Sequence, residues 1–253
     1  MLRAFLGGAV FGTVTEGGEG LAVLLHGWRR TREDFDEVAR ELATLGMGAV
    51  AIDLPGFGAT PPPVAPMGAR GYATTLAPLV AELADAHGPV VLVGHSFGGR
   101  VAACLAAADA SPVKGVVLSG VPLIRSAMPH SAPSIRYRCW REAARLHLVP
   151  ASQLERVRRR YGSADYRAAS GVVRGVLVAS VSETYEAELE AIRCGVSLVW
   201  GERDTTVPVD VAWAAQRHAP KATVEVLAAV GHLVPTEAPA QLAKAAALLG
   251  GAG

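Results

Sequence analysis

The segment Val90-Val91-Leu92-Val93-Gly94-His95-Ser96-Phe97-Gly98 is the strongest indication of the fold of this chain. An apolar segment runs directly into a Gly-x-Ser-x-Gly motif, and a run of small residues typical of a packed helix follows. This context favours a nucleophile elbow over an ordinary strand-to-helix turn, and such an elbow exposes one serine hydroxyl at the end of a sheet. Gly94 and Gly98 fit it because a side chain at either position would collide with neighbouring backbone. Ser96 is therefore the candidate nucleophile.

A serine nucleophile needs a histidine base and a carboxylate that orients the base, and candidates for both follow in the chain. Asp204 lies in a loop after the apolar stretch 196–200, and His232 lies in a loop after the stretch 224–227. Taken singly, Asp204 could be a turn residue and His232 an ordinary loop histidine. Glu202 is a second carboxylate on the same loop as Asp204. Because the order Ser, Asp, His is complete, we predict that Asp204 orients His232.

Another segment, His26-Gly27-Trp28, follows the apolar stretch 21–25. With these features together, the chain resembles the α/β-hydrolase superfamily. In that family the residue after the nucleophile and the residue after such a His-Gly pair supply backbone donors to the oxyanion. The resemblance thus implies that the N–H groups of Trp28 and Phe97 form the oxyanion hole, with their side chains beside the acyl pocket.

The resemblance extends to Asp53-Leu54-Pro55-Gly56-Phe57-Gly58-Ala59-Thr60, a turn at a strand end in which the superfamily usually has serine at the last place. It covers most of residues 21–249 and is interrupted by the segment 121–190. Its motifs are specific for fold and triad, and they leave the substrate open.

Alternating apolar strands and amphipathic stretches predict an α/β fold with a mainly parallel sheet and helices on both faces. Strands are expected at 21–25, 49–52, 90–93, 116–118, 196–200 and 224–227, with edge strands within 2–15. Helices are expected at 31–45, 72–87, 97–108, 210–218 and 237–249. Residues 1–120 and 191–253 are expected to form the α/β-hydrolase core.

The segment 121–190 breaks this alternation and has helical patterns at 136–148, 152–161 and 166–181. In the superfamily an insertion at this place is typically a cap over the active site, so we predict a helical cap. The segment is rich in arginine, which favours a solvated face over a surface that attracts anions. The residues predicted to line the substrate pocket are His26, His95, Met128, Ile135, Trp140 and Leu177.

Composition and charge exclude several classes of protein. A net charge of +1 argues against nucleic-acid binding. No apolar run is long enough for a membrane span, and the first residues do not resemble a signal peptide. Cys104, Cys139 and Cys194 fit no metal spacing and, being odd in number, no disulfide framework. We therefore expect a cytoplasmic protein that needs neither metal nor organic cofactor, and the oligomeric state stays open.

The function that these features predict is a serine esterase, which cleaves a carboxylic ester of a small or medium acyl group through an acyl-enzyme. Three related reactions stay open: meta-cleavage type carbon–carbon hydrolysis, thioester hydrolysis and cofactor-free perhydrolysis. A ligand-binding receptor or scaffold that retains the triad is an alternative of another class. Fold alone does not separate these functions.

Overall fold

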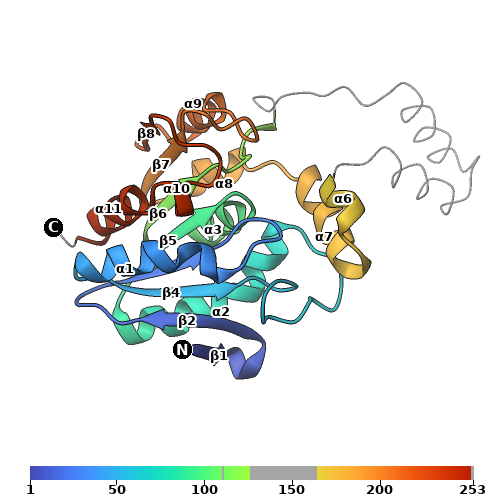
Figure 1. Cartoon of the computed structure of the whole chain (residues 1–253), viewed down its shortest axis with the longest axis horizontal. Helices are drawn as coiled ribbons and strands as arrows, with labels where there is room; N and C mark the ends of the chain where they lie inside the picture. The colour runs from blue at the N-terminus through green and yellow to red at the C-terminus, as the bar shows by residue number, and fades with distance from the viewer. Residues whose placement is uncertain (110, 126–163, 252–253) are drawn as a thin grey trace, which may run out of the picture.

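The computed structural model describes residues 1–109, 111–125 and 164–251, and its centre is one eight-stranded sheet (Figure 1). The strand order across the sheet is β1-β2-β4-β3-β5-β6-β7-β8. The strands are β1 (Leu2–Phe5), β2 (Val10–Thr15), β3 (Leu21–Leu25), β4 (Gly48–Asp53), β5 (Val90–His95), β6 (Val113–Ser119), β7 (Gly195–Gly201) and β8 (Thr223–Leu227).

The six strands from β3 to β8 are parallel, and among the described strands only the pairs of β1 with β2 and of β2 with β4 are antiparallel. The predicted mainly parallel sheet and the N-terminal edge strands are thus confirmed. Because parallel strands end at the same edge, the residues that follow β3, β5, β6, β7 and β8 all gather there. Ligands bind at this edge in open α/β sheets.

Helices cover both faces of the sheet, as predicted. The helices α1 (Asp36–Thr44), α10 (Val234–Glu237) and α11 (Pro239–Gly250) pack on one face. The helices α2 (Ala69–His87), α3 (Phe97–Ala107), α8 (Glu186–Ala191) and α9 (Asp210–His218) pack on the other. Alternate residues of β3 belong to the two cores: Ala22 and Leu24 to the first, Val23 and Leu25 to the second. This period of two is what a strand buried on both faces requires.

Two predicted helices are divided in the structure, and the one expected at 237–249 begins at Pro239. The 3₁₀ turn η2 (Arg32–Phe35) precedes α1 where one helix was expected at 31–45. Ala238 has non-helical backbone and separates α10 from α11, because a residue before proline avoids the helical region. The helix expected at 166–181 is divided into α6 (Ala164–Ala168) and α7 (Gly171–Ser182). Gly171 has φ +52°, a value that interrupts a right-handed helix.

The described part of the segment 121–190 contacts the core at several points. Val173 of α7 lies against Gly56, and Gly175 lies against Pro66, both in the loop between β4 and α2. Figure 1 shows α6 and α7, in yellow and orange, beside this loop. By contrast, α8 packs between α3 and α9 on the sheet domain.

Part of the sequence interpretation falls on residues that the structure does not describe. The predicted helices at 136–148 and 152–161 lie outside the described residues, as do Met128, Ile135, Trp140 and Cys139. Cys104 and Cys194 are free thiols. No helix in the described residues has both the length and the apolar character to cross a bilayer.

Candidate active site

Ser96 occupies a strained turn between the end of β5 and the start of α3. Its backbone has φ +50° and ψ −111°, which few residues other than glycine adopt. The turn is held because the Ser96 N–H donates to Ser119 O on β6 at 2.9 Å, and the Gly98 N–H donates to His26 O at 3.0 Å. The Ser96 side chain is therefore fixed at the carboxyl edge of the sheet.

Both glycines of the Gly-x-Ser-x-Gly motif are required by close backbone contacts. A Cβ on Gly94 would lie 2.5 Å from the Gly99 Cα, and a Cβ on Gly98 would lie 2.2 Å from the Leu25 oxygen. Real Cβ atoms do not approach backbone so closely. These contacts are the physical reason that the motif has glycine at these two places.

Asp204 and His232, which are far apart in the chain, are joined by a hydrogen bond. The loops after β7 and β8 bring His232 Nδ1 within 2.7 Å of Asp204 Oδ2. Asp204 Oδ1 accepts the N–H groups of Thr206 and Val207, both at 2.8 Å, and its side chain is fully buried. With Nδ1–H donated to the carboxylate, Nε2 carries the free lone pair that a general base needs.

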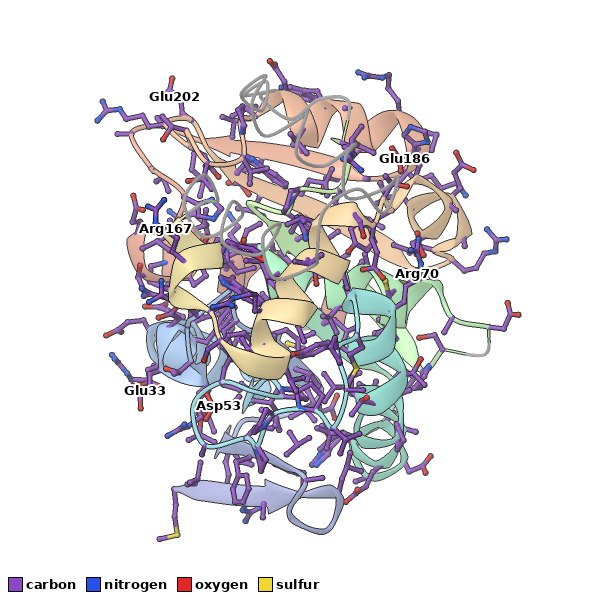
Figure 2. The ribbon with its side chains drawn as sticks, turned by 90° about the vertical axis from the view of Figure 1, so that its right-hand side faces the viewer. Glu33, Asp53, Arg70, Arg167, Glu186 and Glu202 are labelled. Atoms are coloured by element: carbon purple, nitrogen blue, oxygen red, sulfur yellow. The ribbon has the colours of Figure 1, made fainter. Side chains whose placement is uncertain are left out.

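Glu202, the second carboxylate of this loop, is used differently. Its Oε2 accepts the N–H of Ala229 at 3.1 Å. Figure 2 shows its side chain at the outer rim of the molecule. Glu202 therefore does not compete with Asp204 for the imidazole.

Contacts of Gly27 and of the His95 ring connect the Ser96 turn with the loop of His232. A Cβ on Gly27 would lie 3.5 Å from the Ser96 Cβ and 3.1 Å from the His95 ring. The His95 ring is in turn 4.9 Å from the His232 ring, measured between centroids. Among the described residues, Ser96 Oγ has no hydrogen-bond partner. The hydrogen bond between a nucleophile and its base is commonly long without substrate and tightens when substrate binds.

Gly120, which the sequence interpretation missed, makes room for the histidine. It follows β6 with φ +56°, and a Cβ there would lie 2.9 Å from His232 Nδ1 and Cε1. Any side chain at this position would displace the imidazole from Asp204. A Ser-Gly pair after the apolar stretch 116–118 was the available signal, but the partner of Gly120 is 112 positions along the chain.

The two backbone donors implied for the oxyanion hole are free of internal partners in the described residues. Phe97 is the first residue of α3, so its N–H has no acceptor within the helix. The Trp28 N–H, in the loop after β3, has no backbone acceptor either. The N-terminus of a helix also favours negative charge, which suits a site for an oxyanion.

Aromatic side chains pack around these two donors. Trp28 lies edge-to-face on Phe97 at 5.5 Å and on Phe57 at 5.1 Å between ring centroids. Tyr72 packs edge-to-face on Phe97 at 5.0 Å, and its hydroxyl donates to Pro55 O. Burial raises the pKa of Tyr72, so it stays neutral. Phe57 belongs to the strand-end turn at 53–60, but only the structure shows that it is part of this aromatic cluster.

His26 does not line a pocket, which corrects the sequence prediction. Its side chain is fully buried, Nε2 accepts the N–H of Leu54 at 3.0 Å, and Nδ1 lies 2.8 Å from Gly27 O. Burial lowers its pKa, which is consistent with a neutral ring. His26 thus ties the Trp28 loop to the end of β4.

The adjacent Asp53 has a similar structural role at the end of β4. Its carboxylate forms a buried ion pair with Arg32 and accepts the N–H groups of Arg32 and Ala59. Figure 2 labels Asp53 within the body of the molecule. Together with His26, it fixes the loops that precede the site.

His95 was also predicted to line the pocket, but it is only 1% exposed. Its Nδ1 donates to Ser119 O at 3.0 Å, and its ring packs on His232. Burial, with a smaller contribution from His232, lowers the pKa of His95 from its ordinary 6.5 to about 3. His95 is therefore neutral in the folded protein and contacts the candidate base as an uncharged ring.

The low pKa of His95 predicts an acid-sensitive stability. In the unfolded chain His95 binds a proton below pH 6.5, whereas the folded protein resists it until about pH 3. Stability is thus lost as pH falls through this window, by about 2 kcal/mol between pH 6.5 and 5. His95→Asn should remove this loss, as measured by chemical denaturation at both pH values. If the unmodified protein and His95→Asn lose equal stability between the two pH values, His95 is not the group responsible.

Comparison with known families and structures agrees with this fold. The model of the alpha/beta hydrolase family matches residues 22–245, so the chain belongs to that family. Comparison with curated proteins gives no significant match.

Several solved structures share the fold at low sequence identity. A thermophilic esterase from Thermogutta terrifontis is 23% identical with a TM-score of 0.67, covering 93% of this chain and 91% of its own. A bromoperoxidase from Bacillus anthracis is 20% identical with a TM-score of 0.68, covering 95% and 94%. The thioesterase domain from the curacin biosynthetic pathway is 19% identical with a TM-score of 0.69, covering 98% of each chain. These similarities establish the fold. The three proteins are named for different reactions, so they do not indicate one reaction.

Proposed function

We propose that this alpha/beta hydrolase cleaves carboxylic esters of small or medium acyl groups, with Ser96 as nucleophile, His232 as base and Asp204 as the orienting acid. The observation that carries the proposal is the 2.7 Å hydrogen bond between Asp204 and His232, at the same sheet edge as the strained Ser96 turn. A buried carboxylate on Nδ1 is what a serine nucleophile requires of its base.

The proposed reaction has two halves. His232 Nε2 accepts the proton of Ser96 Oγ while the oxygen attacks the ester carbonyl carbon, and the oxyanion accepts hydrogen bonds from the Trp28 and Phe97 N–H groups. The intermediate collapses, the C–O bond breaks, and His232 returns the proton to the leaving alcohol. A water, deprotonated by His232, then attacks the acyl-enzyme and releases the acid and Ser96. Asp204 stabilises the imidazolium in both halves.

The surroundings of the donors support an ester with an apolar acyl group. Trp28, Phe57 and Phe97 form an apolar aromatic cluster beside the two N–H groups. Such surroundings strengthen hydrogen bonds to a developing charge. Thioester hydrolysis is the second candidate, because a thioesterase domain matches 98% of this chain with a TM-score of 0.69.

We propose further that the segment 121–190 is a cap that shapes the acyl site. The contacts of α7 with the loop between β4 and α2 support this, as does the hydrogen bond from Arg100 on α3 to Ser180 O at 2.9 Å. Arg100 is four residues from the nucleophile, so α7 approaches the elbow helix near its start. Leu177, half-buried on α7, is the described residue that we expect to contact acyl chains.

A chain-length series of nitrophenyl esters tests both proposals. The purified protein should hydrolyse short esters, and a meta-cleavage diketone and a thioester included in the series report on the alternative reactions. Leu177→Ala should change the preference between acetate and longer acyl groups by about tenfold or more, because it removes three carbons and even one methylene of fit is worth about tenfold. Val178→Ala, an exposed position on the same helix, is the matched control.

Different results of this series would contradict the ester assignment and the cap. Turnover of the diketone without esters would overturn the ester assignment, and no turnover of any substrate would favour a binding protein. Equal loss on all esters in Leu177→Ala would contradict the cap.

A further inference from the structure

We propose that Glu237 is a positioning residue that holds the loop of His232 in its active geometry. This inference rests on the proposed function, in which His232 is the base. The Glu237 carboxylate accepts the N–H of Gly231 at Oε2, 2.7 Å, and the N–H of Leu233 at Oε1, 3.1 Å. One side chain thus binds the backbone on both sides of His232. It touches neither the imidazole nor Ser96 in the hydrogen bonds of the described residues.

Gly231 is adapted to this contact. A Cβ on Gly231 would lie 3.1 and 3.2 Å from the two Glu237 carboxylate oxygens, closer than most real Cβ contacts. The absence of a side chain lets the carboxylate lie against the loop. The end of β7 also lies directly against this loop, since a Cβ on Gly201 would lie 2.0 Å from Gly231 O. The backbone before His232 is therefore packed between β7 and Glu237.

The loop needs an external support because it belongs to no regular element. It connects β8 to α10, and Ala229 within it has φ +64°, an unfavourable value for a residue with a Cβ. Fixing the backbone of an irregular loop costs conformational entropy, which contacts from outside the loop must offset. A displacement of about 1 Å at a catalytic group can cost on the order of 10²-fold in rate. Small shifts of this loop would therefore affect proton transfer more than substrate binding.

Only a carboxylate satisfies both backbone donors. It has two oxygens and accepts charge-assisted bonds, which are about twice as strong as neutral ones. A glutamine at this position would present one oxygen and one NH₂ group, so one backbone N–H would face another donor. Glu237→Gln therefore breaks half of the contact while its size is nearly unchanged. Because Glu237 is exposed, we expect little effect on folding.

The test compares Glu237→Gln and Glu237→Ala with the control Glu225→Gln. Glu225 is an exposed glutamate on the strand that leads into the same loop, and no hydrogen bond of its side chain is found in the described residues. On a nitrophenyl ester, both Glu237 variants should lower kcat about 10- to 100-fold and leave KM within about twofold, because only the transition state needs the aligned imidazole. Thermal unfolding should be close to that of the control.

A second readout does not need turnover. The proton shared by His232 and Asp204 should give a low-field proton resonance, identified by its loss in His232→Ala. We expect this resonance to be sharp in the unmodified protein and in Glu225→Gln, and broadened or shifted in Glu237→Gln. An unchanged resonance together with unchanged kcat in Glu237→Gln would overturn the positioning role. A parallel fall of kcat and unfolding temperature with an unchanged resonance would also overturn it.

Failure of this inference can be distinguished from failure of the proposed function. If Ser96→Ala retains esterase activity, the proposed function is wrong, whatever Glu237 does. If Ser96→Ala is inactive and Glu237→Gln keeps full kcat, the function stands and only the positioning role falls.

Discussion

Ser96→Ala and His232→Ala should each lower kcat for ester hydrolysis on the order of 10⁴-fold or more while the fold remains intact. Alanine at 96 removes the atom that forms the acyl-enzyme. Alanine at 232 removes the base that activates the serine and protonates the leaving alcohol. Because these groups act as a unit, the double variant should lose little more than either single variant. Initial rates on a nitrophenyl acetate, with circular dichroism as the measure of folding, provide the comparison.

The acyl-enzyme itself gives a direct check of this prediction. Mass spectrometry after mixing with ester, or with a fluorophosphonate, should find one added group on Ser96 in the unmodified protein and none in Ser96→Ala. Near-normal hydrolysis by purified Ser96→Ala would end the proposed mechanism.

Asp204→Asn should have the second-largest effect, about 10³- to 10⁴-fold in kcat, by analogy with the corresponding change in other Ser-His-Asp enzymes. Asp204 Oδ1 accepts two backbone N–H groups, from Thr206 and Val207. An asparagine would keep its oxygen on those donors and turn its NH₂ group toward His232 Nδ1. The imidazole would then have to accept at Nδ1 and carry its proton on Nε2, where it cannot act as base.

Glu202→Gln is the matched control for Asp204→Asn, because both changes replace a carboxylate with an amide on one loop. Glu202 binds the Ala229 N–H through one oxygen, a bond that glutamine can keep. We expect its kcat to stay within about threefold, as for surface changes in general. A larger loss in Glu202→Gln than in Asp204→Asn would show that the orienting acid is misassigned.

Local sequence was sufficient for the elements that build this sheet. Each of the six parallel strands was predicted within a few residues. Five of them are mainly apolar because they are buried on both faces, whereas β8 is a largely exposed edge strand. The strand-to-helix turn around Ser96 was equally readable, since Gly94 and Gly98 are required by contacts with Gly99 and Leu25. Constraints of this kind can be recognised in the sequence, because they determine the residue type at the constrained position itself.

Other features depend on contacts between distant segments and leave only weak local signals. Gly120 is a glycine because of His232, and Gly231 is one because of Glu237 and the end of β7. The burial of His26 and His95 likewise arises from loops that meet only in the folded chain. Single glycines and histidines in loops have many possible causes, so their partners could not be identified from the sequence.

Local sequence patterns were enough to predict the α/β class, the succession of strands along the chain, and the three residue types of the proposed triad in their order. Asp204 and Glu202 stand two positions apart on one loop, and only the folded chain shows which of them lies against His232. It turns the first inward, onto His232 and two backbone donors, and the second outward, onto Ala229. The direction and burial of each carboxylate depend on how the loops after β7 and β8 pack against each other, and no local pattern of residues encodes this packing.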